Sequence, residues 1–274
     1  MTFGYVCTNY KNSAYTQEAV RSLLKDGGDE FRVVVVDNNS DSKNVEVLKN
    51  LASEFRHVEL ILNTENVGYF RGLNMGIRHL RSSQPEINFM IVGNNDLVFP
   101  ADFAETLKKN LSTLEKYAVV APDIITLDGI HQNPHVIHKI SKFREFIYDL
   151  YYANYYLGIA ILKLAKASRR FTERGDQTQH QIAQEIYMGL GACYMLGPKF
   201  FRYFEELWAP TFLVHEEYFL SKQLNDKGLC IYYEPAIKVL HHFRAAMAAL
   251  GDREAWRISR DAHKMRRQYV KVFG

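Results

Sequence analysis

The stretch Ile91-Val92-Gly93-Asn94-Asn95-Asp96-Leu97-Val98-Phe99 changes abruptly from apolar to polar. Residues 89–92 are apolar, which is typical of a buried strand in a parallel sheet. Open α/β sheets bind ligands outside the carboxyl ends of their strands, where the strand order reverses. Asp96 is therefore a candidate ligand for a divalent cation, since such ions take oxygen ligands from one or two carboxylates and from phosphates. Taken alone, the stretch fits equally well a turn that caps the element after it.

Three earlier segments repeat the pattern of a buried strand followed by polar residues. Residues 3–8, 31–36 and 58–62 are predicted strands, and amphipathic helical patterns lie between them. This alternation predicts an α/β fold with a mostly parallel central sheet flanked by helices. One edge of that sheet should carry the polar side chains that follow the strands, namely Thr8, Asn9, Asp37, Asn38, Asn66 and Asp96.

Composition limits the class of protein. The 274 residues are 47% hydrophobic and 24% charged, which suits a globular chain with a substantial core. The net charge is only +3, so nucleic acid is not an expected partner. The three cysteines share no metal-ligand spacing, and the first residues lack the pattern of a signal peptide. We therefore expect a cytoplasmic protein.

A glycine-containing loop at residues 68–72 precedes a helix that is predicted to begin near Asn74. Glycine lets a ligand approach the backbone, and a helix N-terminus together with Arg71 would attract phosphate. The dinucleotide fingerprint G-x-G-x-x-G does not follow the first strand, and no P-loop motif occurs. These two nucleotide-binding folds are therefore excluded.

The ordered set of motifs resembles the family 2 glycosyltransferases of the GT-A fold. The residues that carry the resemblance are Thr8-Asn9-Tyr10, Val35-Val36-Asp37-Asn38-Asn39-Ser40, Asn66-Val67-Gly68 with Gly72 and Asn74, Asn94-Asn95-Asp96, Gly191-Ala192-Cys193, His215-Glu216-Glu217 and Val239-Leu240-His241-His242. The resemblance implies a single Rossmann-like GT-A domain with a C-terminal helical extension. Residues 1–100 would bind a nucleotide-sugar, 101–250 would form the acceptor-binding and catalytic half with a variable helical insertion at 126–185, and 251–274 would form a basic helix.

The resemblance also implies roles for the polar residues of the donor half. The base and ribose of a UDP-, dTDP- or GDP-linked sugar would contact Thr8, Asn9 and Asp37, although Asp37 also fits a cap at the strand end. The diphosphate and the sugar would contact Asn66, Gly68, Arg71 and Asn74, although Arg71 also fits a solvated surface. Asn95 would approach the ribose or diphosphate, and the same matched motifs bring Tyr10 and Asn39 to the donor.

By resemblance, Asp96 matches the last carboxylate of the family's D-x-D element, which binds Mn²⁺ or Mg²⁺. Asn94 stands at the first position, so one carboxylate is left to hold the ion. His241 matches the V-x-H motif and would be a second ligand, with His242 as the alternative. An imidazole ligand favours Mn²⁺ over Mg²⁺. A histidine at a strand end also fits a purely structural role.

Glu216 and Glu217 precede an apolar helical pattern and should lie in its first turn, where the helix dipole keeps carboxylates ionised. An ionised carboxylate facing an acceptor hydroxyl is what a general base requires. The resemblance assigns that role to Glu217. The family commonly has Asp there, so the choice between Glu216 and Glu217 stays open.

Two segments suggest further partners. Residues 143–170 include the aromatic stretch 151–162 followed by cations, and the tail from Trp256 is a basic amphipathic helix. Such segments fit peripheral contact with the inner face of a membrane, and they fit equally a cover for the sheet, a homodimer contact or a solvated face.

We therefore predict an inverting, metal-assisted transfer of a sugar to a hydroxyl of a glycan or lipid-linked glycan, in the synthesis of a surface polysaccharide. One alternative is a nucleotide-sugar-binding or scaffolding module that has lost turnover, which the absent carboxylate at Asn94 favours. Another is a sugar nucleotidyltransferase, which would need a glycine-rich loop where Thr8-Asn9-Tyr10-Lys11-Asn12-Ser13 has no glycine.

Overall fold

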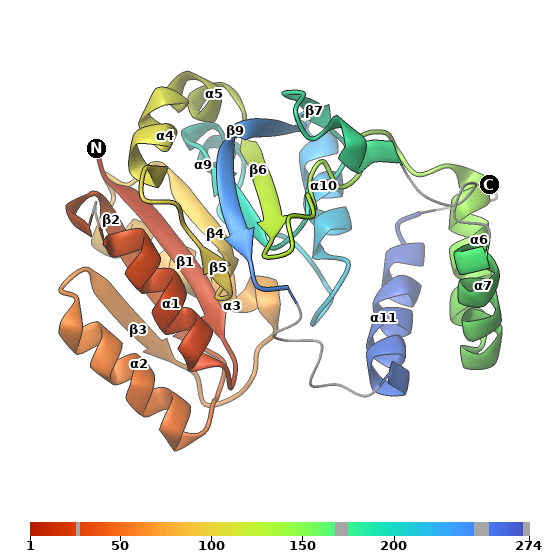
Figure 1. Cartoon of the computed structure of the whole chain (residues 1–274), viewed down its shortest axis with the longest axis horizontal. Coiled ribbons are helices and arrows are strands. Elements are labelled where there is room, and N and C mark those ends of the chain that lie inside the picture. The colour runs from red at the N-terminus through yellow and green to blue at the C-terminus, as the bar shows by residue number, and fades with distance from the viewer. Residues whose placement is uncertain (26–27, 168–174, 244–251, 271–274) are drawn as a thin grey trace.

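The computed structural model describes residues 1–25, 28–167, 175–243 and 252–270 (Figure 1). Its centre is a nine-stranded sheet with the order β3-β2-β1-β4-β8-β6-β9-β5, and β7 pairs with β9. The strands are β1 Phe3–Asn9, β2 Phe31–Asp37, β3 Val58–Leu62, β4 Met90–Asn94, β5 Leu97–Val98, β6 Val119–Thr126, β7 Gln184–Ile186, β8 Cys193–Leu196 and β9 Ile231–His241. The helices are α1 Ser13–Leu24, α2 Ser42–Glu54, α3 Tyr69–Ser83, α4 Phe103–Lys109, α5 Leu111–Lys116, α6 Lys142–Ala153, α7 Tyr155–Ala167, α9 Pro198–Tyr203, α10 Glu216–Asn225 and α11 Asp252–Arg267, with short 3-10 turns at Gly28–Glu30 and Gly175–Gln179.

The first four strands are parallel to one another, as predicted. Strand β1 pairs in parallel with both β2 and β4, and β2 pairs in parallel with β3. Strand β8 runs antiparallel to β4 and β6, so the C-terminal half makes the sheet mixed. The strand order reverses between β1 and β4, and ligands bind α/β sheets at such a point.

Alternate residues of the buried strands feed two cores on opposite faces of the sheet. In β1, Tyr5 and Cys7 pack in the core that α1, α2 and α4 cover, whereas Val6 packs in the core that α3, α9 and α10 cover. Successive strand residues point to opposite faces, so a strand covered on both faces is apolar throughout. The sheet is therefore held rigidly at its centre, and only its strand ends are free for polar chemistry.

Helix α3 corrects the sequence prediction, because it begins at Tyr69 and not near Asn74. Gly68 precedes it with a φ of 91°. A Cβ at Gly68 would lie 2.5 Å from the backbone oxygen of Phe212, so no side chain fits there. The predicted glycine-containing loop is therefore mostly the first turn of the helix.

Helices α6, α7 and α11 form a separate arm at one end of the molecule (Figure 1). The apolar stretch 151–162 is two helices and not one, because the chain breaks at Asn154, which has an extended backbone. Helix α11 is fixed to α6 by two ion pairs, Arg266 with Glu145 and Arg267 with Asp149. None of the described helices is long and apolar enough to cross a membrane.

Candidate active site

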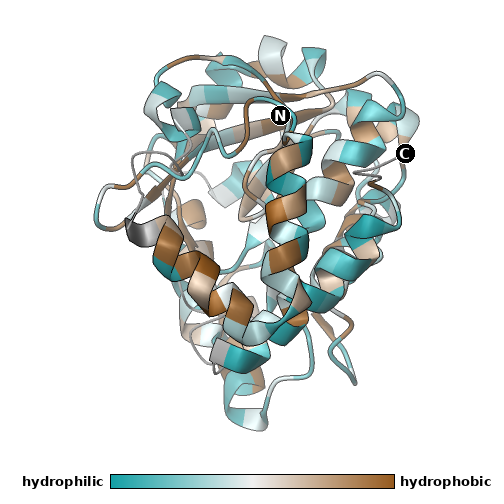
Figure 2. Ribbon diagram, turned by 90° about the vertical axis from the view of Figure 1, so that its right-hand side faces the viewer, coloured by the Kyte–Doolittle hydropathy of each residue, from teal (hydrophilic) through white to brown (hydrophobic). Residues whose placement is uncertain are grey.

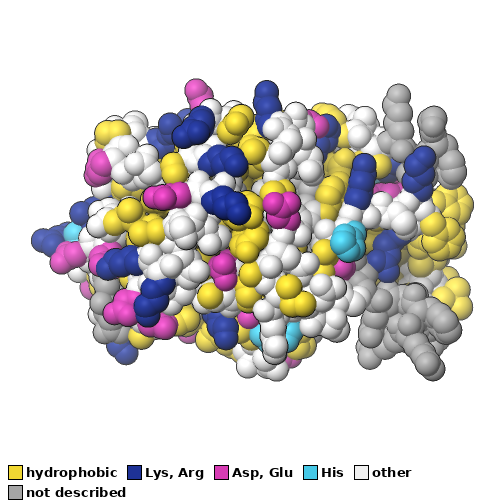
Figure 3. All heavy atoms as spheres, turned by 90° about the horizontal axis from the view of Figure 1, so that it is seen from above, with side chains coloured by type: hydrophobic (Ala, Val, Ile, Leu, Met, Phe, Trp, Pro, Cys, Tyr) yellow, Lys and Arg dark blue, Asp and Glu magenta, His cyan; other side chains and the backbone are white. Residues whose placement is uncertain are grey.

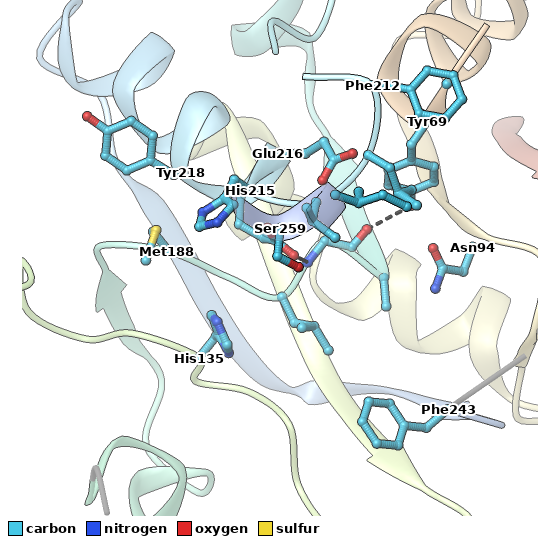
Figure 4. Close-up of a pocket in the computed structure, with 18 of the residues that line it drawn as sticks. Tyr69, Asn94, His135, Met188, Phe212, His215, Glu216, Tyr218, Phe243 and Ser259 are labelled. Atoms are coloured by element: carbon cyan, nitrogen blue, oxygen red, sulfur yellow. Dashed lines mark hydrogen bonds between the residues drawn. The ribbon is translucent and has the colours of Figure 1, made fainter. Parts of the chain in front are cut away.

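A cavity of about 1480 Å³ opens at the polar edge of the sheet. Its walls come from both halves of the chain: Asn94 from the end of β4, Glu216 from α10 and Ser259 from α11 surround one space (Figure 4). Predicted site residues that line it are Thr8, Tyr10, Asn66, Gly68, Asn95, Asp96, Glu216, Glu217 and His241. The topology thus brings together motifs more than 200 residues apart in the sequence.

Behind the cavity wall, a closed network of hydrogen bonds joins the ends of β1, β2 and β4. The Asn9 amide donates to Asp37 Oδ1 at 2.7 Å, and the backbone N–H of Ser40 donates to Asp37 Oδ2 at 2.9 Å. The Asn95 amide donates to Asn9 and to the Thr16 hydroxyl. Asn9 and Asp37 are buried and lie outside the cavity lining, so the structure places them as supports of the wall.

Three other residues that were predicted to bind donor also lie outside the cavity lining. Asn74 is buried, and its amide exchanges two hydrogen bonds with the backbone of Leu207, at 2.8 and 2.9 Å. Arg71 is exposed on α3, and Asn39 is exposed with a φ of 65°. Asn74 therefore fastens the segment around Leu207 to α3.

Asp96 and His241 meet where β5 pairs with β9. The register pairs Leu97 with His241, and the backbone N–H of His242 donates to the Asp96 carbonyl oxygen at 3.0 Å. His241 Nε2 lies 3.2 Å from Asp96 Oδ1, and both side chains are buried. Despite this distance, Asp96 Oδ1 has no hydrogen-bond partner.

The second nitrogen of His241 fixes the tautomer of the ring. His241 Nδ1 lies 2.7 Å from the Gln132 side-chain oxygen, which only accepts, so Nδ1 carries the proton. The lone pair of Nε2 therefore points toward Asp96 and the Asn94 amide, which lies 3.3 Å away. A metal-binding histidine usually donates its other N–H in this way. An imidazole nitrogen and an unpartnered carboxylate oxygen side by side fit a divalent cation.

The alternative ligand His242 points elsewhere. Its Nε2 lies 3.0 Å from Glu18 Oε2, and its ring packs against Tyr15 of α1. It is not among the residues that line the cavity. The geometry therefore favours His241 over His242 as a ligand.

A second group of candidate metal ligands, Asp123, His131 and His180, lies outside the cavity lining. The two histidine rings stack with their centroids 3.6 Å apart and 18° between their planes. The ligand lone pairs of an imidazole lie in its ring plane, so nearly parallel rings do not direct two nitrogens at one ion. His131 Nδ1 instead contacts Asp123 Oδ1 at 2.8 Å.

Glu216 and Glu217 occupy the first turn of α10, as predicted, and they differ in environment. Glu217 is half-buried and accepts a hydrogen bond of 3.3 Å from the backbone N–H of Gly191. A Cβ at Gly191 would lie 2.9 Å from the same carboxylate oxygen, so a side chain there would displace the Glu217 carboxylate. Glu216 is buried, and its Oε1 has no partner. Burial, and next the charge of Glu217, raise the pKa of Glu216 to about 8.

His215 stands immediately before α10 with a φ of 65°, an uncommon conformation for a residue other than glycine. Burial, followed by the charge of Arg266, lowers its pKa to about 3. The ring is therefore neutral in the physiological range, and it lines the cavity (Figure 4).

Sequence reasoning did not find several residues of the site. Gln132 orients His241, Tyr69 donates its hydroxyl to the Gly191 carbonyl oxygen at 2.7 Å, and Ser259 lines the cavity. Arg266 belongs to the basic tail, yet it is only 2% exposed, lies over the rings of Tyr148 and Tyr218, and lines the cavity. The adjacency of Tyr69 to the Gly68 motif was a usable signal, whereas nothing local distinguishes Gln132.

Comparisons with known proteins agree with this arrangement. Residues 6–170 match the family model described as "Glycosyl transferase family 2". A mannosyltransferase from Pyrobaculum calidifontis, solved with GDP-Man and Mn²⁺, is 14% identical and superposes with a TM-score of 0.58 over 98% of this chain and 64% of that one. GalNAc-T7 with UDP, GalNAc and Mn²⁺ is 11% identical, with a TM-score of 0.57 over 88% of this chain and 44% of that one.

A third similar structure is S. aureus TarS 1-349 with UDP-GlcNAc, which is 12% identical with a TM-score of 0.54 over 92% of this chain and 62% of that one. At these identities the likeness concerns the fold, and the chain spans less than two thirds of the length of each of the three. No curated protein matches the sequence.

Proposed function

Because the chain belongs to glycosyl transferase family 2, we propose that it transfers a sugar from a nucleoside diphosphate-sugar to a hydroxyl of a glycan or lipid-linked glycan. The observation that carries the proposal is the shared cavity. Polar strand ends of the N-terminal half meet two carboxylates and a histidine of the C-terminal half there. A nucleotide-sugar-binding module would need only the polar strand ends. Sugar transfer also needs a general base and room for the acceptor.

In this proposal the donor lies across the ends of β1 and β4. Thr8 and Tyr10 contact the nucleoside, while Asn66 and Gly68 at the start of α3 face the diphosphate. The positive end of the helix dipole favours an anion at that place. The mannosyltransferase and TarS, which share the fold, were solved with GDP-Man and with UDP-GlcNAc.

Asp96 and His241 fit a divalent cation. The lone pair of His241 Nε2 points toward Asp96, and Asp96 Oδ1 has no hydrogen-bond partner. When bound there, Mn²⁺ or Mg²⁺ supplies positive charge that stabilises a leaving diphosphate. Two of the structures with this fold were solved with Mn²⁺. Gln132 keeps the proton of His241 on Nδ1, so Nε2 stays available as a ligand.

The transfer step needs a carboxylate that is ionised at neutral pH. Glu216, with a pKa of about 8, keeps its proton at pH 7 and is a poor base. Glu217 lines the cavity and accepts a hydrogen bond from the backbone N–H of Gly191, which positions its carboxylate there. We assign the base to Glu217: it takes the proton of the acceptor hydroxyl while that oxygen bonds to the anomeric carbon and the bond to the diphosphate breaks. A single displacement of this kind inverts the anomeric centre.

The test is release of nucleoside diphosphate from UDP-, GDP- and dTDP-sugars, with Mn²⁺ and with excess EDTA. The proposal expects turnover with one nucleotide class, faster with added acceptor glycans and abolished by EDTA. Absence of turnover with every donor, together with intact nucleotide binding, would favour a degenerate binding module instead.

A further inference from the structure

The outward side of α7 carries an apolar stripe that the described chain leaves open to solvent. Tyr156 is 70% exposed and Leu164 is 69% exposed, and Leu157 and Ala160 are exposed beside them. Successive positions in this set lie one, three and four residues apart, which places all four within about 100° of the helix circumference, on one face. Phe143, 73% exposed, adds an aromatic ring from the start of α6. We call these five residues the outer face.

The opposite side of α7 fixes this orientation. Gly158 is buried, and a Cβ there would lie 2.8 Å from the Tyr151 backbone oxygen of α6 and 3.2 Å from the Trp256 indole nitrogen of α11. Helix α7 therefore leans on α6 and α11 through a position where only glycine fits. The outer face is held outward by packing, and Figure 2 shows the apolar band along α7.

The three helices of the arm that carries the outer face are together positively charged. Helices α6, α7 and α11 contain ten lysines and arginines against five carboxylates, a net charge of +5, whereas the whole chain carries +3. Lys163 of α7 and Arg253, Arg257 and Lys264 of α11 are exposed. Seen from above, hydrophobic and some basic side chains are visible at this end of the molecule, as they are elsewhere on the same side (Figure 3).

An apolar stripe with exposed aromatic rings and a basic border has the chemistry of a surface that lies in a bilayer interface. Apolar side chains enter the boundary of the acyl chains, while lysines and arginines pair with anionic headgroups. A protein partner of matching shape would need no such excess of positive charge. No described helix is long and apolar enough to span the membrane, so this contact is peripheral.

We propose that the outer face docks the protein onto an anionic lipid surface. Helices α6 and α11, on which α7 leans, wall the active-site cavity, since Tyr148 and Tyr152 of α6 and Ile258 of α11 line it. Docking through α7 brings the acceptor end of the cavity to the membrane. If the proposed transfer holds, the surface selects acceptors that are themselves anchored in lipid.

Vesicle co-sedimentation without any sugar substrate tests the docking, so its result is independent of the proposed transfer. Wild type at about 0.1 M salt should bind vesicles that contain phosphatidylglycerol and bind pure phosphatidylcholine vesicles weakly. The triple variant Tyr156→Ser, Leu157→Ser and Leu164→Ser should bind at least tenfold more weakly. The triple variant Arg253→Ala, Arg257→Ala and Lys264→Ala should lose most of the preference for the anionic vesicle.

A matched control carries three apolar-to-serine changes at exposed positions outside the arm, namely Leu62, Leu127 and Ile130, which are 43%, 61% and 55% exposed. It should bind vesicles like wild type. Circular dichroism spectra and melting temperatures equal to those of wild type establish that each variant folds. If the serine triple variant does not fold, the single variants Tyr156→Ser and Leu164→Ser replace it.

Two results would overturn the proposal. One is that wild type binds neither vesicle. The other is that the serine triple binds the anionic vesicle as strongly as wild type does. A wild-type dimer that the serine triple converts to a monomer, with no vesicle binding, would identify the outer face as a protein interface.

Discussion

The two ends of the cavity are built differently. At the donor end, the side chains of Asn9, Asp37 and Asn95 hydrogen-bond one another and their neighbours behind the wall. At the acceptor end, two residues that line the cavity have buried polar atoms without a hydrogen-bond partner, Glu216 Oε1 and Arg266 Nε. Buried polar groups are normally hydrogen-bonded, because leaving one unsatisfied costs about 1–3 kcal/mol.

The difference indicates a division of labour. The hydrogen-bond network of Asn9, Asp37 and Asn95 is complete before a ligand arrives, whereas Asp96 Oδ1 has no hydrogen-bond partner and binds a cation in our account. At the acceptor end, the unpartnered atoms of Glu216 and Arg266 face a cavity in which hydroxyls of an acceptor, or water, can pair with them. Substitutions at the donor end should therefore mainly lower the stability of the fold. Substitutions at the acceptor end should mainly lower the rate of transfer.

The largest expected effect separates the two carboxylates of α10. Glu217→Gln should lower the rate of transfer by about 10²–10⁴ while nucleotide affinity stays unchanged, because the base is lost and the donor wall is intact. Glu216→Gln, which keeps a neutral side chain of similar shape, should cost less than tenfold. Steady-state kinetics with calorimetric nucleotide binding gives both values, and a larger loss for Glu216→Gln would reverse our assignment.

Stability of the donor end depends on how closely α3 lies on the sheet. A Cβ at Gly76 would lie 2.3 Å from Val6 Cγ1 of β1, so Gly76→Ala should destabilise the fold by about 2 kcal/mol through overpacking. Gly28→Ala is the matched control, since its Cβ would meet only Leu24 Cβ, at 3.9 Å. Urea denaturation measures both variants, and equal midpoints would show that α3 and the sheet can separate at no cost.

The pH dependence of stability tests the acceptor end. Glu216 has its pKa raised from 4.5 to about 8, so between these values the folded state keeps a proton that the unfolded state has lost. Stability from this group is therefore lost as the pH rises through that window. Melting temperatures of wild type should fall relative to Glu216→Gln from pH 5 to pH 9, by about 2–4 °C or more. Parallel curves would mean that Glu216 is ionised in the folded protein.

The smallest expected effect is at Arg71, which the sequence suggested for the diphosphate. Because Arg71 is exposed and outside the cavity lining, Arg71→Ala should change the donor KM by less than about twofold. An increase of tenfold or more would show that the arginine reaches the bound donor after all.

The sequence predicted the fold better than it predicted the site. The spacing of apolar residues and the polar residues that follow each strand are local features of the sequence. The first four strands and the polar edge could therefore be predicted from residues 3–96 alone. The pairing of Leu97 with His241 is long-range, and only the resemblance to a family pointed to it. A motif does not show the contacts that its residues make: in the structure Asn74 hydrogen-bonds the backbone of Leu207, and Arg71 is exposed. Arg266 was hidden in a helix whose charge pattern also fits a solvated face.

The most direct test of the account is a thermal-shift panel of UDP, GDP, dTDP and CMP, each with and without Mn²⁺, on wild type and Asp96→Ala. A ligand present at about 100 times its dissociation constant adds about 2.7 kcal/mol of stability. We predict that one nucleoside diphosphate stabilises wild type only with Mn²⁺ and that Asp96→Ala loses this response. A metal-independent shift that survives in Asp96→Ala would contradict the cation site at Asp96 and His241. No shift with any nucleotide would contradict the donor site itself.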